Sequence, residues 1–235
     1  MRSKTLMNVS SGRRPAALAK TSGAAAVRRI LETYAGLAER GEHLLQRLLD
    51  GQPPRQWQHY PEEDAIDLRS AYQWFYHSHS PEDRPGSVEH GHFHLFARRP
   101  LWSRRLHSRT EQAFARLTGQ PQRTVQTRHL LSIGLDAKGV PVSLFTVNSW
   151  VTGDLMLNAV LTEQLLARIQ LNTGHPDIER MLTNLIRLCL PQIRLLLVAR
   201  DAALASCQPG TVLTDQTLEV LSHLPIDLDR QFLAG

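Results

Sequence analysis

Two short segments with strict alternation constrain the fold of this chain most strongly. From Tyr72 to about His79, and again from Glu89 to Ala97, side chains of one kind recur at every second position, and the intervening SPEDRPGS is rich in turn-forming residues. Successive side chains of a β-strand point to opposite faces of the sheet. The two segments therefore predict an antiparallel hairpin, with one face carrying the histidines. The histidines expected on that face are His77, His79, His90, His92 and His94.

A second hairpin follows at residues 127–150, where TRHLLSIGL and VPVSLFTV are joined through Asp136-Ala137-Lys138-Gly139. Apolar residues at helical intervals predict helices around these hairpins, and Pro191 should kink or split the last of them. The expected fold is α+β, an antiparallel sheet built from two hairpins and packed by N-terminal and C-terminal helices. The expected helices are 27–48, 101–118, 155–169 and 176–205.

The charge distribution separates a tail from the rest of the chain. Residues 1–30 contain seven of the 27 basic residues and no acidic residue, which leaves 20 basic against 22 acidic residues elsewhere. The positive net charge is therefore a property of the N-terminus. We expect residues 1–25 to form a disordered basic tail and residues 26–235 a single α+β domain that carries the histidine-rich hairpin 72–98. The arginine-rich stretch 98–128 lacks interleaved aromatic residues, so nucleic acid is not an expected partner.

Composition also sets expectations about the compartment. The sequence contains no uncharged apolar run of about 18 residues, so we expect no membrane span. The N-terminus has no apolar stretch typical of a secretion signal. The two cysteines, Cys189 and Cys207, are too few for a disulfide scaffold. These features favour a reducing, cytoplasmic location.

The histidine face predicts a metal site. Pairing Phe75 with Phe96, or shifting the register so that His77 faces His92, places two His-x-His pairs side by side, provided the hairpin has no bulge. Strands about 4.8 Å apart let four imidazoles converge on one ion about 2.1 Å from each nitrogen. Nitrogen ligands favour iron, copper or zinc over magnesium and calcium. The alternative interpretation is that these are ordinary sheet histidines on a polar face. The candidate metal ligands are His77, His79, His90, His92, His94 and His129.

Not all of these histidines can bind the same ion. His90 and His94 should lie about 13 Å apart along one strand, so one histidine of the second strand should lie outside the first ligand shell. Glu89 should point to the opposite face by alternation and become a ligand or base only if a bulge near Gly91 turns it round. The remaining histidines are expected at the surface or as helix caps, and they are His43, His59, His107, His175 and His223.

The histidine pattern only partly matches known metal motifs. Cupins place a glutamate three or four residues after His-x-His, and here Glu82 follows His79 inside a proline-rich turn. The JAMM metalloprotease motif requires an aspartate where His90 stands, and it leads into a helix rather than a strand.

A combination of segments resembles an uncharacterised bacterial domain family of unknown function. The segments are YPEED, YHSH, EHGHFHLF, HLLSIGLDAKGVPVSLFTVNSWVTGD and LLLVARDAAL, and the resemblance covers residues from about Tyr60 to Ala203. The family has no established activity that could be transferred. The resemblance implies a family signature of Tyr76, His77, His79, Glu89, His90, His92, His94, His129, Asn148 and Trp150.

Three classes of function follow from this pattern. The first is a histidine-ligated metalloenzyme acting on a small molecule, with Glu89 and Tyr76 as candidate catalytic residues and Asn148 and Trp150 as candidate pocket residues. Oxidation is favoured over metal-dependent hydrolysis, because imidazole-rich sites without paired carboxylates are commoner among oxidoreductases. The second is a structural or sensory metal-binding domain without turnover. The third is a metal-free domain with a pH-responsive histidine cluster.

Overall fold

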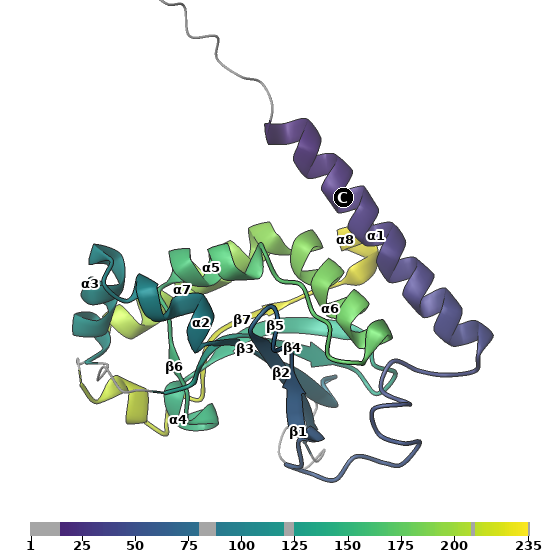
Figure 1. Ribbon diagram of the computed structural model, residues 1–235, viewed down its shortest axis with the longest axis horizontal. Coiled ribbons are helices and arrows are strands. Elements are labelled where there is room, and N and C mark those ends of the chain that lie inside the picture. Colours follow the sequence, from purple (N-terminus) through teal and green to yellow (C-terminus); the bar gives the residue numbers. More distant parts are fainter. Residues whose placement is uncertain (1–14, 80–87, 120–124, 208–209, 235) are drawn as a thin grey trace, which may run out of the picture.

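The computed structural model describes residues 15–79, 88–119, 125–207 and 210–234, with the side chains of residues 15–22 and 234 excepted. A curved sheet forms one layer, and helices cover one of its faces (Figure 1). Neighbouring strands follow the order β1-β2-β3-β4-β5-β7 and are antiparallel, while the short β6 pairs in parallel with β4. The strands are β1 (Tyr60–Ile66), β2 (Tyr72–Ser78), β3 (Gly91–Arg98), β4 (Thr127–Leu135), β5 (Pro141–Val147), β6 (Leu155–Met156) and β7 (Val220–Pro225).

The helices confirm the expected α+β class. The long helices α1, α6 and α7, together with α5, form the covering layer, in which α1 packs on α6 and α7 packs on α5, β5 and β7. The α-helices are α1 (Pro15–Glu39), α2 (Arg99–Trp102), α3 (Arg109–Thr118), α4 (Ser149–Thr152), α5 (Ala159–Leu166), α6 (Pro176–Leu188), α7 (Leu190–Ala205) and α8 (Leu228–Ala234), and the 3-10 helices are η1 (Ser103–Arg105) and η2 (Val212–Thr214).

The N-terminal helix differs from the sequence-based expectation at both ends. It begins at Pro15, within the segment 1–25 expected to be a disordered tail, and residues 1–14 lie outside the described part of the chain. The alanine-rich sequence after Pro15 has high helix propensity, which accounts for the earlier start. The helix ends at Glu39 rather than near Leu48, because Gly41 adopts a left-handed φ of 66° and the chain turns there.

The C-terminal helical segment is divided close to the expected position. Helices α6 and α7 meet at Cys189 and are bent by 76°, with Pro191 in the first turn of α7. Within the described residues no single helix is long and apolar enough to cross a membrane; this bent pair meets the length and composition criteria only when its two helices are taken together. Much of α6 is buried, and the helix packs on α1 and on α7.

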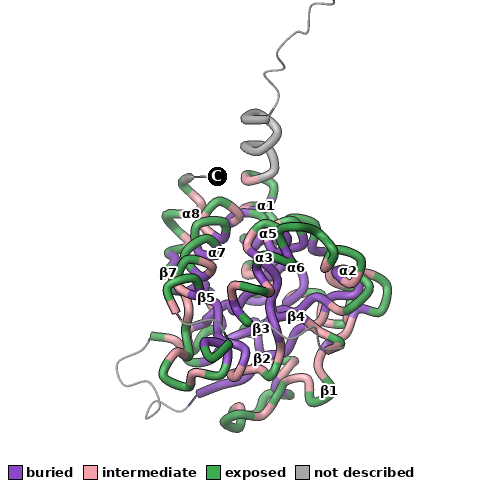
Figure 2. Tube along the Cα trace, turned by 90° about the vertical axis from the view of Figure 1, so that its left-hand side faces the viewer, coloured by how far each residue is buried: buried purple, intermediate pink, exposed green. Residues whose placement is uncertain are grey.

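The two faces of the β2–β3 hairpin have different roles. The register pairs His77 with His92 and Phe75 with His94, which is the shifted one of the two registers considered above. One face presents Trp74, Tyr76, Phe93 and Leu95 to the helix layer, where they join the main hydrophobic core. The opposite face carries the histidines. Figure 2 shows mainly buried residues in the central strands β2 to β5, while exposed residues lie on the helices and in the loops.

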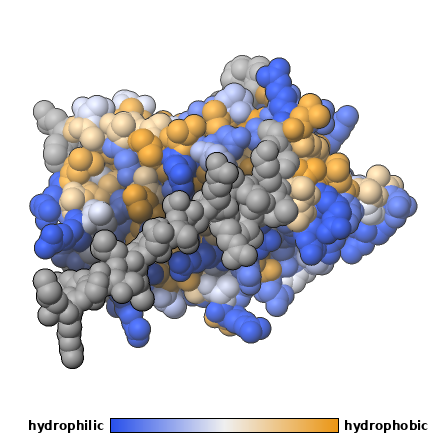
Figure 3. All heavy atoms as spheres, turned by 90° about the horizontal axis from the view of Figure 1, so that it is seen from above, coloured by the Kyte–Doolittle hydropathy of each residue, from blue (hydrophilic) through white to orange (hydrophobic). Residues whose placement is uncertain are grey.

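The outer surface of the helix layer mixes hydrophilic and hydrophobic side chains. Figure 3 shows this surface, with hydrophobic residues scattered between charged ones. The large apolar side chains that are more than half exposed in α5 and α7 are Val160, Leu195 and Val198. Scattered exposed apolar residues are normal on soluble domains, so this surface alone identifies no partner.

Candidate metal centre

The histidine face of the sheet brings together side chains from three adjacent strands. β2 contributes His77, and His79 lies one residue beyond its end; β3 contributes His92 and His94, and β4 contributes His129. All five side chains are buried, with exposures from 9% for His77 to 0% for His94. The alternation seen in the sequence therefore places His77 and His79 of one strand segment on the same face as His92 and His94 of the next.

His92 is the centre of the cluster. Its Nε2 lies 2.7 Å from Nε2 of His77 and 2.9 Å from Nε2 of His94. The ligand atoms of His77, His79 and His92 all lie within 4.8 Å of one another. This buried triad could hold a metal ion. Two nitrogens that each lie about 2.1 Å from one ion are about 3 Å apart when they subtend a right angle, so the observed spacings fit shared coordination.

The other ring nitrogen of His92 is held by a carboxylate. Nδ1 lies 2.9 Å from Oε1 of Glu89. An ionised carboxylate only accepts hydrogen bonds, so Nδ1 donates and Nε2 presents its lone pair to the cluster. Ligating histidines almost always have such a partner for the second nitrogen, because it fixes the tautomer and the orientation of the ring.

Glu89 reaches the histidine face without a bulge in β3. The strand begins at Gly91, so Glu89 precedes it. The alternation of side-chain directions within β3 therefore does not determine where the Glu89 side chain points. The carboxylate lies over Gly134 of β4, where a Cβ atom would come within 2.3 Å of Oε2. Oε2 also accepts a 3.0 Å hydrogen bond from Ser143 of β5. The absence of a side chain at Gly134 thus creates the space in which Glu89 contacts His92.

A second pair of contacts extends the cluster toward β4. Nδ1 of His94 lies 3.0 Å from Oγ of Ser132 and 3.1 Å from Nε2 of His129. Burial and the neighbouring His92 lower the pKa of His94 well below its usual value, and burial and the charge of Arg200 lower the pKa of His129 to about 3. Both imidazoles are therefore neutral near pH 7. If His94 turns the Nε2 lone pair toward His92, its proton lies on Nδ1, where Ser132 and His129 can accept it.

Aromatic side chains surround the histidines on the same face. Phe75 lies 5.0 Å from His94, Phe96 lies 5.3 Å from His129, and Phe145 lies 4.9 Å from His92, measured between ring centroids. Phe75 and Phe96 thus flank the cluster. A shell of this kind excludes water and lowers the local dielectric around a bound ion.

His90 and Tyr76 lie apart from this cluster. His90 is exposed, and its Nδ1 is 3.5 Å from the hydroxyl of Tyr76. Tyr76 packs in the core on the helix-covered side, where burial and then the charge of Glu89 raise the pKa of its hydroxyl. Gly91 makes room for this tyrosine, because a Cβ there would lie 2.3 Å from the Tyr76 hydroxyl oxygen.

Asn148 and Trp150 lie at another edge of the domain and stabilise a loop. Asn148 caps α4 by accepting a hydrogen bond from the Ser149 amide, and its Nδ2 donates to the carbonyl of Val212. The indole of Trp150 donates to the carbonyl of Leu218. Trp150 also lines a cavity of about 400 Å³. These hydrogen bonds join the two side chains to backbone groups of Ser149, Val212 and Leu218 and not to a histidine of the cluster.

Several residues near the cluster were missed by sequence reasoning. Trp57 lies edge-on to His77 and His79, and His59 stacks on Phe75 at a centroid distance of 3.7 Å. Both belong to the proline-rich loop before β1, which has no periodic pattern. Ser132, Gly134 and Ser143 were also missed, although each lies two residues from another position on the same face of β4 or β5.

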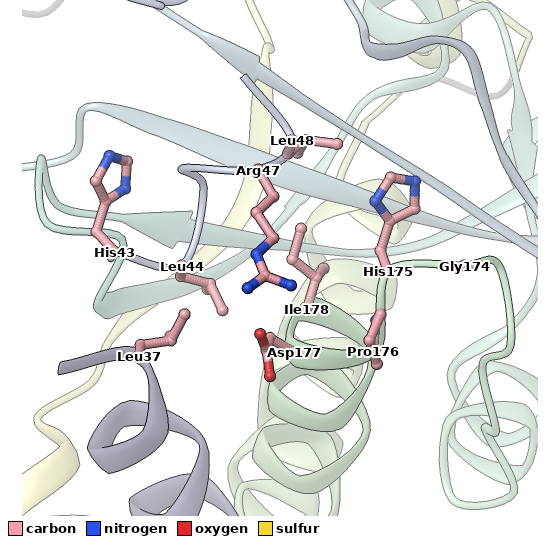
Figure 4. Close-up of a pocket in the computed structure, with 10 residues that line it drawn as sticks. All are labelled: Leu37, His43, Leu44, Arg47, Leu48, Gly174, His175, Pro176, Asp177 and Ile178. Carbon is pink, nitrogen blue, oxygen red and sulfur yellow. The ribbon is translucent and has the colours of Figure 1, made fainter. Parts of the chain in front are cut away.

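A separate pocket involves two other histidines on the helix-covered side (Figure 4). His43 and His175 lie at opposite sides of this pocket, with Arg47 between them and Asp177 nearby. Its volume is about 100 Å³, and Asp177 pairs with Arg40 at 2.8 Å. Among the described residues, the triad of His77, His79 and His92 brings its ligand atoms within 4.8 Å of one another, and no such triad lies in the pocket of Figure 4. The histidine face is therefore the better candidate for a metal site.

Comparisons with known proteins agree with the resemblance noted in the sequence. Neither the curated proteins nor the solved structures include a match to this chain. One family does match, over residues 24–226, which run from within α1 to just past the end of β7. The chain belongs to the family described as "Domain of unknown function (DUF6969)".

Proposed function

We propose that this protein binds a transition metal ion through His77, His79 and His92, with His94 as a fourth nitrogen donor, and acts as a metalloenzyme on a small molecule. The observation that carries the proposal is the environment of His92. Its Nε2 contacts two other imidazole nitrogens, while its Nδ1 is held by the carboxylate of Glu89. A single hydrogen bond to Nδ1 would be enough to satisfy a structural histidine. The convergence of the His77 and His94 Nε2 atoms on Nε2 of His92 is instead what shared coordination of an ion requires.

The ligand chemistry supports iron, copper or zinc. Neutral imidazoles suit these ions, whereas magnesium and calcium prefer oxygen ligands. A bound iron or copper ion would supply redox chemistry, and a bound zinc ion would supply Lewis-acid chemistry. The protein contributes the burial, the ring orientation and the aromatic shell described above.

The role of Glu89 bears on the choice between oxidation and hydrolysis. Both of its carboxylate oxygens are engaged, one by His92 and one by Ser143. We therefore assign Glu89 to positioning His92 rather than to general base catalysis. This assignment supports oxidoreduction over hydrolysis, because a hydrolase would need another base near the ion.

The alternative is a metal site without turnover. Four nitrogens from His77, His79, His92 and His94 could close the coordination shell of the ion, and catalysis requires an exchangeable position. A closed shell would exclude added ligands from the ion, and chelation would then cause a large loss of melting temperature. Ligand binding to the metal-loaded protein separates the two readings.

Elemental analysis of untagged protein by plasma mass spectrometry tests the proposal directly. We expect about one equivalent of iron, copper or zinc per chain. The double variant His79→Ala/His92→Ala should lose it, while His107→Ala, a change at an exposed residue outside the cluster, should retain it. Equal metal content in the two variants, or no metal in wild-type protein even after reconstitution, would refute the site and leave a polar histidine cluster.

Both cysteines of the protein are free thiols. This state supports the cytoplasmic location expected from the sequence, because thiols persist in reducing compartments. A small molecule remains the proposed partner.

A further inference from the structure

Trp57 has an unusual combination of backbone conformation and exposure. Its φ is 63°, in the left-handed region, and 57% of the residue is exposed. Bulky residues rarely adopt positive φ, and such outliers persist where the surrounding structure imposes them, often at functional sites. An exposed indole also forgoes the stability that burial would give.

The loop around Trp57 is held against β2 on both sides of the residue. Gln56 forms a β-bridge with Ser78, and the amide of Trp57 donates to the carbonyl of Ser78 at 3.4 Å. Two residues later, His59 stacks on Phe75, and its Nδ1 lies 2.9 Å from Asp64. Trp57 is therefore fixed by contacts on both sides even though its own side chain is largely exposed.

The indole of Trp57 lies beside the least buried ligands of the proposed centre. Its ring centroid is 4.8 Å from that of His79 and 5.8 Å from that of His77. These two histidines are 8% and 9% exposed, compared with 2% for His92 and 0% for His94. A small molecule approaching the ion from the more exposed side would therefore come close to Trp57. An ion bound to His79 would lie within about 8 Å of the indole, which is within the reach of a ring attached to a metal-coordinating group.

We propose that Trp57 is a specificity-determining residue that stacks against a planar aromatic ring of the substrate while another group of that substrate coordinates the metal. This inference rests on the metal centre proposed above. Indole is the largest aromatic face available to a protein, and the arrangement beside His77 and His79 leaves it accessible to a ligand. The fixed loop lowers the entropic cost of presenting it.

Two hydroxamates that differ only in a ring provide the test. Acetohydroxamate and benzohydroxamate share the metal-coordinating group, and only the second carries a phenyl ring. The protein is reconstituted with Co²⁺, and binding of each probe is measured from the change in visible absorption. Trp57→Leu retains apolar bulk without an aromatic face, and Trp57→Phe retains a ring.

We expect Trp57→Leu to weaken benzohydroxamate binding by about 5- to 20-fold while changing acetohydroxamate binding less than twofold. Trp57→Phe should keep most of the wild-type affinity for benzohydroxamate. If the affinities for both probes fall together, or if neither changes, ring recognition by Trp57 is wrong. Failure of both probes to bind the Co²⁺-loaded wild type would also reject it, while leaving metal binding intact. Failure to load Co²⁺ would instead reject the proposed centre, and cobalt content measured on every sample distinguishes these cases.

Discussion

Oε1 of Glu89 and Nδ1 of His92 lie 2.9 Å apart, and both side chains are almost completely buried. The two residues are three positions apart in the sequence. Glu89 precedes β3, and His92 lies inside this strand. The contact fixes the tautomer of His92 and turns its Nε2 toward His77 and His94. We therefore regard Glu89 as the residue that converts an ordinary sheet histidine into a directed nitrogen donor.

Gly134→Ala should weaken metal binding without unfolding the protein. The new Cβ would lie 2.3 Å from Oε2 of Glu89 and 2.2 Å from Oγ of Ser143, so the carboxylate must move away from His92. Loss of such an outer partner typically reduces metal affinity about 10- to 100-fold. Competition with a chromogenic chelator measures the affinity, and far-ultraviolet circular dichroism checks that the fold is retained.

Gly36→Ala is the matched control for this substitution. Gly36 lies in α1, and a Cβ there would meet its nearest neighbour, the Arg40 side chain, at 3.4 Å. The control should leave metal affinity unchanged and stabilise the helix by up to about 1 kcal/mol. Equal metal affinity in Gly134→Ala and wild type would show that the Glu89 contact does not support the centre.

The sequence was most informative where the alternation of side chains was strict. It predicted that His77 and His92 share one face with His79 and His94, because a strand admits only two orientations for a side chain. It could not predict the orientation of Glu89, since that depends on β3 beginning at Gly91 rather than at Glu89. Because β3 begins two residues later than expected, His90 also lies outside the strand. It is exposed beside Tyr76 and is not part of the cluster.

The strands that sequence reasoning missed are short or lie at the edges of the sheet. β1 has the sequence YPEEDAI, in which acidic residues and a proline give no apolar alternation, and among the described strands it pairs only with β2. β7 has a mostly exposed or half-buried pattern, and β5 is its one partner in the described part of the sheet. Edge strands bury less surface and therefore carry weaker sequence signals. Trp57 was missed for a related reason, because a loop residue gains its position from tertiary contacts.

Trp57→Gly should be more stable than Trp57→Ala. Both variants lose the indole, but only glycine adopts a φ near 63° without steric cost. We expect a difference of about 1 kcal/mol in the free energy of unfolding, measured by urea denaturation. Leu68 is a suitable control, because it is 84% exposed and is not among the described non-glycine residues with positive φ. There Leu68→Gly should be no more stable than Leu68→Ala, and the same order at both positions would argue against strain at Trp57.

The two thiols should react at very different rates in the native protein. Cys189 is fully buried between α6 and α7, and burial raises the pKa of its thiol to about 12. Cys207 is only partly buried. Since the thiolate is the reactive form, a disulfide reagent at pH 8 should modify one thiol per chain quickly and the second only after denaturant is added. Cys207→Ser should abolish the fast phase and Cys189→Ala should retain it; two fast thiols in native wild type would contradict this prediction.

Asp67 connects two loops through backbone hydrogen bonds. Its Oδ1 accepts bonds from the amides of Arg69 and Ser70, and its Oδ2 accepts one from the amide of Asn172, all at 2.9 Å. Burial alone would raise the pKa of this carboxyl, but the hydrogen bonds from Ser70, Arg69 and Asn172 outweigh burial and lower it. A depressed pKa means that the carboxylate stabilises the fold at neutral pH.

Asp67→Asn should therefore destabilise the protein in a pH-dependent manner. An amide cannot accept on both sides, because its NH₂ group would face one of the three amides, and the expected loss is about 1–3 kcal/mol at pH 7. This stabilisation is present above the pKa of about 3.9 in the unfolded chain and disappears as the pH falls through the lower folded value. The difference between wild type and variant, measured by urea denaturation, should thus be full above about pH 5 and shrink below about pH 4. Glu63→Gln, at an exposed position of β1, should show less than about 0.5 kcal/mol at any pH. A difference for Asp67→Asn that stays constant down to about pH 3 would show that shape and not charge underlies the contact.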